Sequence, residues 1–119
     1  MALGGAAGTL LRYGISSVVL KQEQILPMGT LVVNLSGSFV IGLLWGWHQN
    51  APFSSVVASF LFVGLLGGYT TFSSFSLENL LLLRQGNYLQ AFLYIIASSV
   101  GGLLAAYGGL RLSGNELQA

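Results

Sequence analysis

The chain has 119 residues, of which 54% are hydrophobic and only 6% are charged, and its formal net charge is +1 at pH 7. Soluble domains carry about 25% charged residues, so this composition indicates an all-α integral membrane protein with no room for a soluble catalytic domain. The weak net charge argues against nucleic-acid binding, and the absence of cysteine excludes disulfides and thiolate metal sites.

Hydropathy predicts four membrane spans, at about Leu3–Leu20, Thr30–Trp47, Phe53–Leu83 and Tyr88–Leu110. They form a single transmembrane domain over residues 1–112, and residues 113–119 form a polar tail. The apolar N-terminus lacks a basic leader, so it is interpreted as the first span and not as a cleaved signal peptide. The third span, with about 31 residues at ~1.5 Å per residue, would reach ~46 Å. Because the hydrocarbon core is only about 30 Å thick, this span must tilt steeply or break.

The centre of the third span combines Gly67-Gly68 with the hydroxyl-rich run Thr70-Thr71-Phe72-Ser73-Ser74-Phe75. Paired glycines followed by hydroxyl residues continue a membrane helix poorly, and they leave carbonyl and hydroxyl groups facing something polar. Non-helical backbone at membrane depth persists only where protein buries it or where it lines a wet cavity. We therefore predict that the third helix is broken mid-membrane, and we expect the function to lie at the break.

The 17 glycines are spaced for close helix packing. Small residues four apart occur in each span, at Gly4/Gly8, Gly42/Gly46, Gly64/Gly68 and Ala97/Gly101/Ala105. This spacing lets the backbones of membrane helices approach closely. A tightly packed four-helix protomer leaves no central hole, so a permeation path would run between subunits, which predicts an oligomer.

The basic residues are divided evenly between the two sides of the membrane. Lys21 and Arg84 fall on one side, and Arg111 falls on the other with Arg12, if Arg12 is assigned toward the N-terminus. Because Lys and Arg bias sets orientation, an even division favours insertion both ways and pairing with an inverted copy. The alternative is that a short chain simply has few charges.

Polar side chains inside the spans are candidates for function. A centred Arg12 costs about 2.5–3.5 kcal/mol on insertion scales, so it faces a vestibule or the bundle interior, or snorkels to the interface. The Asn34 amide could donate to an anion, although tying two helices together is the more frequent role. Glu78 shares one helical face with Thr71 and Ser74.

Phe72 and Phe75 share the neighbouring face, and Tyr94, Ser98 and Gly102 form a stripe along the fourth span. A phenyl ring has a negative face and a positive edge, so an anion should prefer the edge. Two ring edges beside an amide and hydroxyls would form a donor-rich path without a fixed charge, which suits a small hydrated anion. Packing in a core or against lipid is the more frequent role of such phenylalanines.

Three segments of the sequence resemble the small fluoride-channel family, Fluc/CrcB. They are Gly4-Gly5-x-x-Gly8-x-x-x-Arg12-Tyr13, Pro27-x-Gly29-Thr30-Leu31-x-Val33-Asn34-x-x-Gly37-Ser38-Phe39-x-x-Gly42 and Gly64-x-x-Gly67-Gly68-Tyr69-Thr70-Thr71-Phe72-Ser73-Ser74-Phe75-Ser76-x-Glu78. The last segment is highly specific, and the fourth span carries the least specific match.

The resemblance implies an antiparallel, dual-topology homodimer in a cell membrane, the bacterial inner membrane, which exports fluoride passively through two pores. It implies a structural sodium ion at the dimer centre, held by the backbone carbonyls of Gly67 and Thr70 from both subunits. It implies a fluoride path lined by Asn34, Thr71, Phe72, Phe75, Tyr94 and Ser98, a polar group of Thr30, Ser74 and Glu78 beside it, and Arg12 in the vestibule. The partners would be fluoride, lipid and a second copy of the chain.

Two other functions stay open. A small proton-coupled multidrug exporter would need a carboxylate in its substrate cavity; Glu78 is the only intramembrane candidate, and Arg12 counts against cation export. A membrane packing or chaperone subunit would explain the glycines but not Asn34 or the broken span. An enzyme is not expected, because the sequence contains no nucleophile–base pair or metal cluster.

Overall fold

The computed structural model describes residues 1–19 and 27–114, and every regular element within them is helical. The helices are α1 (Ala2–Val19), α2 (Met28–Asn50), α3 (Ser55–Ala58), the π-helix η1 (Ser59–Leu65), α4 (Leu66–Tyr69), α5 (Phe72–Arg84) and α6 (Tyr88–Leu112). The expected end of the first span at Leu20, the charge at Lys21 and the polar tail from residue 115 lie outside the described residues.

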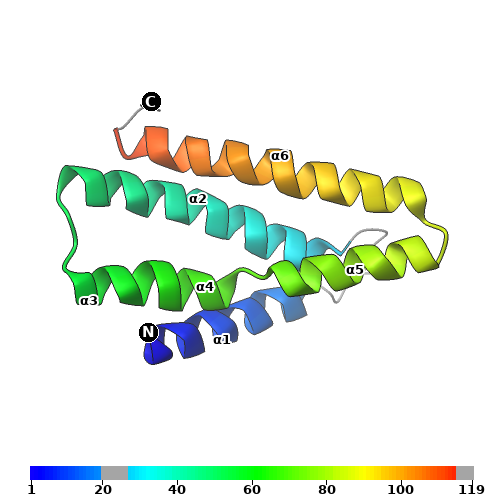
Figure 1. Ribbon diagram of the computed structural model, residues 1–119, viewed down its shortest axis with the longest axis horizontal. Coiled ribbons are helices and arrows are strands. Elements are labelled where there is room, and N and C mark those ends of the chain that lie inside the picture. The colour runs from blue at the N-terminus through cyan, green and yellow to red at the C-terminus, as the bar shows by residue number, and fades with distance from the viewer. Residues whose placement is uncertain (20–26, 115–119) are drawn as a thin grey trace.

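The helices run alongside one another as a layered bundle (Figure 1). Helix α2 lies between α6 and the line formed by α3, η1, α4 and α5, and α1 packs against η1, α4 and α2. The most extensive contact joins α2 to α6. Thus α2 is the central element, and it faces the interrupted third segment along its length.

Three helical stretches are long and apolar enough to cross a membrane: Met28–Asn50, Ser55–Arg84 and Tyr88–Leu112. The chain is therefore a multi-pass membrane protein. Helix α1 has 18 residues and carries Arg12, and it covers the region expected to form the first span.

The predicted break in the third segment is confirmed, and it falls at Thr70 and Thr71. Both residues have extended backbone, with φ −84° and ψ 159° at Thr70 and φ −150° and ψ 122° at Thr71. The helix resumes at Phe72 because Thr71 caps it: the Thr71 side-chain oxygen accepts a hydrogen bond from Ser74 N at 3.2 Å. The hydroxyl run that predicted the break therefore also contains the residue, Thr71, that starts the next helix.

The π-helix before the break was not predicted. It spans Ser59–Leu65, and the N–H of Leu66 bonds back to the carbonyl of Leu61, five residues earlier. Apart from Ser59 the segment is apolar, so no change of periodicity in the sequence marks the wider turn. This turn carries Gly64, which faces α1.

Glycines allow the closest helix contacts, as their spacing predicted. A Cβ on Gly4 would lie 2.7 Å from the Phe60 carbonyl oxygen, and one on Gly64 would lie 2.7 Å from that of Met1. Between α2 and α6, a Cβ on Gly42 would overlap the Ala106 carbonyl and one on Gly109 would overlap the Phe39 carbonyl. The backbones approach as closely as membrane helices do when small residues line the contact.

The interior of one protomer contains few buried apolar side chains. They are Leu31, Val33, Leu66, Leu82, Ala91 and Tyr94. Large apolar side chains are exposed on every long helix, for example Leu3 at 81% and Leu103 at 75%. Apolar exposure on this scale requires lipid or another protein surface as its environment.

Adjacent glycines on α6 provide a test of this packing. Gly109→Ala should lower the melting temperature, because its Cβ would overlap the Phe39 carbonyl and overpacking costs about 1–3 kcal/mol. Gly108→Ala is the matched control, since a Cβ there meets nothing within 4 Å. Thermal unfolding in detergent, followed by the fluorescence of the two tryptophans, measures both. Equal melting temperatures for the two variants would contradict the contact.

Candidate functional site

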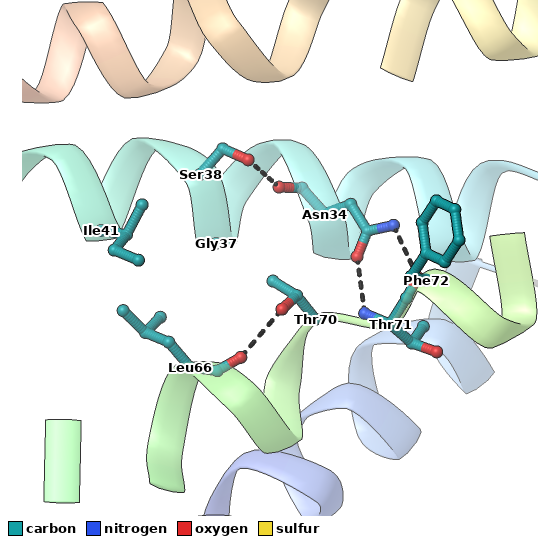
Figure 2. Close-up of a pocket in the computed structure, with 8 residues that line it drawn as sticks. All are labelled: Asn34, Gly37, Ser38, Ile41, Leu66, Thr70, Thr71 and Phe72. Atoms are coloured by element: carbon teal, nitrogen blue, oxygen red, sulfur yellow. Dashed lines mark hydrogen bonds between the residues drawn. The ribbon is translucent and has the colours of Figure 1, made fainter. Parts of the chain in front are cut away.

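Asn34 binds the backbone of the break from the neighbouring helix α2. Its Oδ1 accepts a hydrogen bond from Thr71 N at 2.9 Å, and its Nδ2 donates to the Thr71 carbonyl oxygen at 3.1 Å (Figure 2). Of the two roles considered for this amide, the protomer shows the tie between helices. The Nδ2 group carries two hydrogens, and the one that remains has no acceptor within the described residues.

The break releases the carbonyl oxygens of residues 67–70 from helical hydrogen bonding, and those of Gly67 and Thr70 are two of these four. In a continuous α-helix Thr71 N would bond to the Gly67 carbonyl and Ser74 N to that of Thr70. Instead Thr71 N donates to Asn34, and Ser74 N donates to the Thr71 hydroxyl. The two carbonyls are those predicted to hold a cation, and Gly67 lies at an open position where an added Cβ meets only Phe62 O, at 3.9 Å.

Two helix ends of opposite polarity meet at the break. The segment from α3 through α4 ends at Tyr69 with its carbonyl groups, which carry partial negative charge, and α5 begins at Phe72 with its amide groups, which carry partial positive charge. Interrupted membrane helices use such ends to hold cations on carbonyls and anions on amides. The break therefore offers both kinds of ligand group without a charged side chain.

Two hollows meet at the break. One, of about 270 Å³, lies between α2 and the break (Figure 2) and is lined by Asn34, Gly37, Ser38, Ile41, Leu66, Thr70, Thr71 and Phe72. The other, of about 320 Å³, is lined by Thr9, Arg12, Tyr13, Ser16, Thr30, Thr71, Ser74 and Glu78. Thr71 borders both hollows, so the extended residue at the break forms the partition between them.

Three side chains from three helices form a hydroxyl–carboxylate group beside the second hollow. Thr30 donates to Glu78 Oε1 at 2.6 Å, and Tyr94 donates to Glu78 Oε2 at 2.9 Å. The resemblance placed Thr30, Ser74 and Glu78 together, and the structure joins Thr30 to Glu78 while Ser74 lines the same hollow. Tyr94 was placed along the ion path instead, and in the protomer it is 0% exposed. No sequence pattern paired Tyr94 with Glu78; the only signal was that a tyrosine hydroxyl in an apolar helix needs some hydrogen-bond partner.

The aromatic residues predicted to line a path form a continuous row. The rings of Phe72 and Phe75 lie 5.7 Å apart between centroids, and those of Phe75 and Tyr94 lie 5.0 Å apart. Phe72 is 78% exposed, whereas Phe75 packs against the buried cluster around Leu31 and Leu82. The row therefore leads from the protomer surface into its interior.

Two donors near the site are buried and have no partner within the described residues. They are the Ser98 hydroxyl on α6 and the Nε–H of Arg12 on α1. Arg12 lines the hollow that also contains Glu78. Unsatisfied buried donors are costly, so their presence is consistent with a site that a ligand or water completes.

An interrupted membrane helix, with freed backbone groups and polar hollows on both sides, places the protein in the class of multi-pass membrane proteins that bind or pass ions at a broken helix. The family model described as CrcB-like protein, Camphor Resistance (CrcB), matches residues 1–110. The chain belongs to this family, and the resemblance inferred from its motifs is confirmed.

Curated relatives match over nearly the whole chain. One from Parabacteroides distasonis is 43% identical over 116 residues, which are 97% of this chain and 91% of the relative. One from Flavobacterium psychrophilum is 47% identical, over 95% of this chain and 93% of the relative, and one from Desulfotalea psychrophila is 44% identical, over 91% and 85%. Each of the three is named a fluoride-specific ion channel, FluC.

The carboxylate group can be tested for its part in stability. Thr30→Val keeps the shape of the side chain but removes one donor to Glu78, so we expect a loss of about 1–3 kcal/mol in stability and a lower melting temperature. Thr9→Val is the control, because Thr9 lines the same hollow and makes no hydrogen bond to Glu78. If the Thr30→Val and Thr9→Val proteins have the same melting temperature, the hydrogen bond between Thr30 and Glu78 is not stabilising.

Proposed function

We propose that the chain is a passive fluoride-selective channel that exports fluoride from the cytoplasm, and that it is not an enzyme. The observation that carries this proposal is the broken third segment, whose freed amide, carbonyl and hydroxyl groups stand beside the Phe72–Phe75 ring pair. The names of the curated relatives supply the ion, because the chain covers most of their length at more than 40% identity.

The proposed path uses neutral donors and has no fixed charge along it. Fluoride would pass the remaining Nδ2 hydrogen of Asn34, the edges of Phe72 and Phe75, and the hydroxyls of Thr71 and Ser98. Tyr94 would contribute its ring from α6, next to that of Phe75. Fluoride is small and holds water tightly, so close hydrogen-bond donors can replace its water, while a fixed positive charge would trap it. Arg12 lines the hollow beside this path and would raise the local concentration of anions.

The proposed unit is an antiparallel homodimer with two pores, inserted in both orientations in the bacterial inner membrane. In this unit α1 also crosses the membrane, in addition to the three longer helical stretches. The support is the even division of Lys and Arg, the exposure of Phe72 in a single protomer and the small buried core. A path that begins at an exposed ring needs a second wall, and a second copy of the chain would provide it.

A sodium ion fits the break chemically. The released carbonyls of Gly67 and Thr70 are neutral, hard oxygen ligands, and two from each subunit would give four around a two-fold axis. Such ligands suit an alkali cation better than zinc or copper. The ion would satisfy carbonyls that the break leaves without helical partners, and its charge would favour anions nearby.

The runner-up function, a proton-coupled multidrug exporter, fits the site less well. Its mechanism would need a carboxylate that is free to exchange protons and cations. Both oxygens of Glu78 already accept hydrogen bonds, from Thr30 and Tyr94. A flux assay in liposomes separates the candidates, because a channel gives fast passive fluoride efflux, an exporter gives proton-dependent cation flux and a packing subunit gives neither.

The ring-edge path predicts a large loss of flux for conservative changes. Phe72→Ile and Phe75→Ile keep an apolar side chain but remove the positive ring edge, and each should lower fluoride efflux by orders of magnitude with the dimer assembled. Asn34→Leu should do the same, whereas Arg12→Ala should have a smaller effect because it changes only the local anion concentration.

Fluoride efflux from liposomes, read with a fluoride electrode, measures these variants. Phe92→Ile is the matched control, since Phe92 lies on α6 away from the ring row and is 60% exposed. Wild-type flux in both Phe→Ile variants together with a dead Arg12→Ala protein would replace this account with a fixed-charge anion site.

Dual topology predicts that a C-terminal tag is labelled from both sides of the membrane by an impermeant reagent. Two or three Lys added at Gln49–Ala51 should bias orientation by the positive-inside rule and abolish flux of the homodimer. The same number of added Gln is the control, and it should leave both orientations populated. A wild-type tag that is reached from one side only would refute the inverted dimer.

A further inference from the structure

A second tie joins α2 to the break, two residues along from Asn34. The hydroxyl of Ser36 lies 2.8 Å from the hydroxyl of Tyr69, the last residue of α4. Asn34 and Ser36 therefore contact Thr71 and Tyr69, the two neighbours of Thr70 in the chain. The residue whose carbonyl is proposed to bind the cation is held on both sides from one helix.

Either hydroxyl of this second tie could be the donor. Ser36 has one hydroxyl hydrogen, and its oxygen also lies 3.1 Å from the Val33 carbonyl, which can only accept. Both contacts are made together when Ser36 donates to Val33 and Tyr69 donates to Ser36. Both hydroxyls are committed in this arrangement, so the pair acts as a mechanical contact and offers no donor to a passing anion.

The backbone between the two ties has little freedom. A Cβ on Gly37 would overlap the methyl group of Thr70 and would lie 3.3 Å from a ring carbon of Tyr69, so the break is pressed against α2. The Thr70 hydroxyl donates to the Leu66 carbonyl at 2.9 Å, and Thr70 N donates to the same oxygen at 3.0 Å. These contacts leave the Thr70 carbonyl as the group of this residue that can turn outward.

We infer that the Tyr69–Ser36 hydrogen bond is a positioning contact for the cation site, and that it works with the Asn34–Thr71 pair as a clamp around Thr70. The inference rests on the proposed sodium site. A clamp that fixes Thr70 keeps its carbonyl and that of Gly67 at the separation that a small cation needs. Without the Tyr69 hydroxyl the ring still packs on Gly37, but the carbonyls lose one of their two restraints.

The test is the sodium dependence of the melting temperature of the full chain in detergent, with choline replacing sodium at constant ionic strength. A ligand that binds the folded state stabilises it by RT ln(1 + [ligand]/Kd), so the sodium concentration at which the melting temperature begins to rise reports the affinity. Tyr69→Phe and Ser36→Ala should each move this onset to about threefold to tenfold higher sodium, the change expected when one net hydrogen bond is lost.

Three further variants separate positioning from general stability. The double variant Tyr69→Phe/Ser36→Ala should shift the onset no further than Ser36→Ala alone, because Ser36→Ala already removes the bond to Tyr69. Ser36→Thr keeps the hydroxyl and should retain the wild-type onset. Tyr88→Phe is the control for loss of a tyrosine hydroxyl, since Tyr88 is 68% exposed and lies at the start of α6.

The possible outcomes distinguish the role of the Tyr69–Ser36 contact from the proposed sodium site and the proposed channel. A melting temperature that falls equally at all sodium concentrations, with an unchanged onset of the rise, would show that the pair is only structural and would overturn the inference while the cation site stands. A wild-type protein that does not respond to sodium would refute the cation site and this role with it. If Tyr69→Phe does not fold, Ser36→Ala decides between these outcomes. Fluoride efflux of the wild type, measured in parallel, tests the channel independently of both.

Discussion

Asn34 and the backbone of Thr71 exchange two hydrogen bonds inside an otherwise apolar bundle, and the geometry of the site follows from that exchange. The bonds replace what Thr71 would have made in a continuous helix, so the backbone N–H and C=O of Thr71 are satisfied without water. An unpaired backbone group in a membrane costs several kcal/mol, and an amide side chain offers a separate donor and acceptor that can pair with both groups of one residue. The same exchange frees the Gly67 carbonyl and leaves the amide end of α5 at the break.

Glycine contacts provide the proximity on which this exchange depends. Asn34 reaches the break only because α2 lies against it at Gly37, where any side chain would overlap Thr70. On the opposite side, α1 lies against η1 and α4 at Gly4, Gly8, Gly64 and Gly68. The broken segment is thus held between two helices, and its irregular backbone is shielded where the packing is closest. Function and packing use the same small residues.

Several groups around the break have no partner, or no covering contact, within the described part of the chain. Phe72 is mostly exposed, Gly67 is open, and the donors of Ser98 and Arg12 are buried without partners in the described part of the chain. By contrast, Glu78 is fully engaged by Thr30 and Tyr94, which ties α2, α5 and α6 together around a carboxyl group.

The sequence by itself determined the class, three of the expected spans and the place of the break, because these depend on local composition: apolar runs, paired glycines and the hydroxyl run. Glycine spacing likewise indicated which faces pack closely. Tertiary structure alone decided which partners the polar groups take. Asn34 could have faced an anion or a helix. Only the approach of α2 to Thr71 selects the pair of hydrogen bonds between the Asn34 amide and the Thr71 backbone. Tyr94 meets Glu78, and Ser36 meets Tyr69, across separations in sequence that no local pattern encodes. The π-helix could not be predicted from the sequence. Its segment is apolar apart from Ser59, and the wider turn depends on packing against α1 more than on the residues within it.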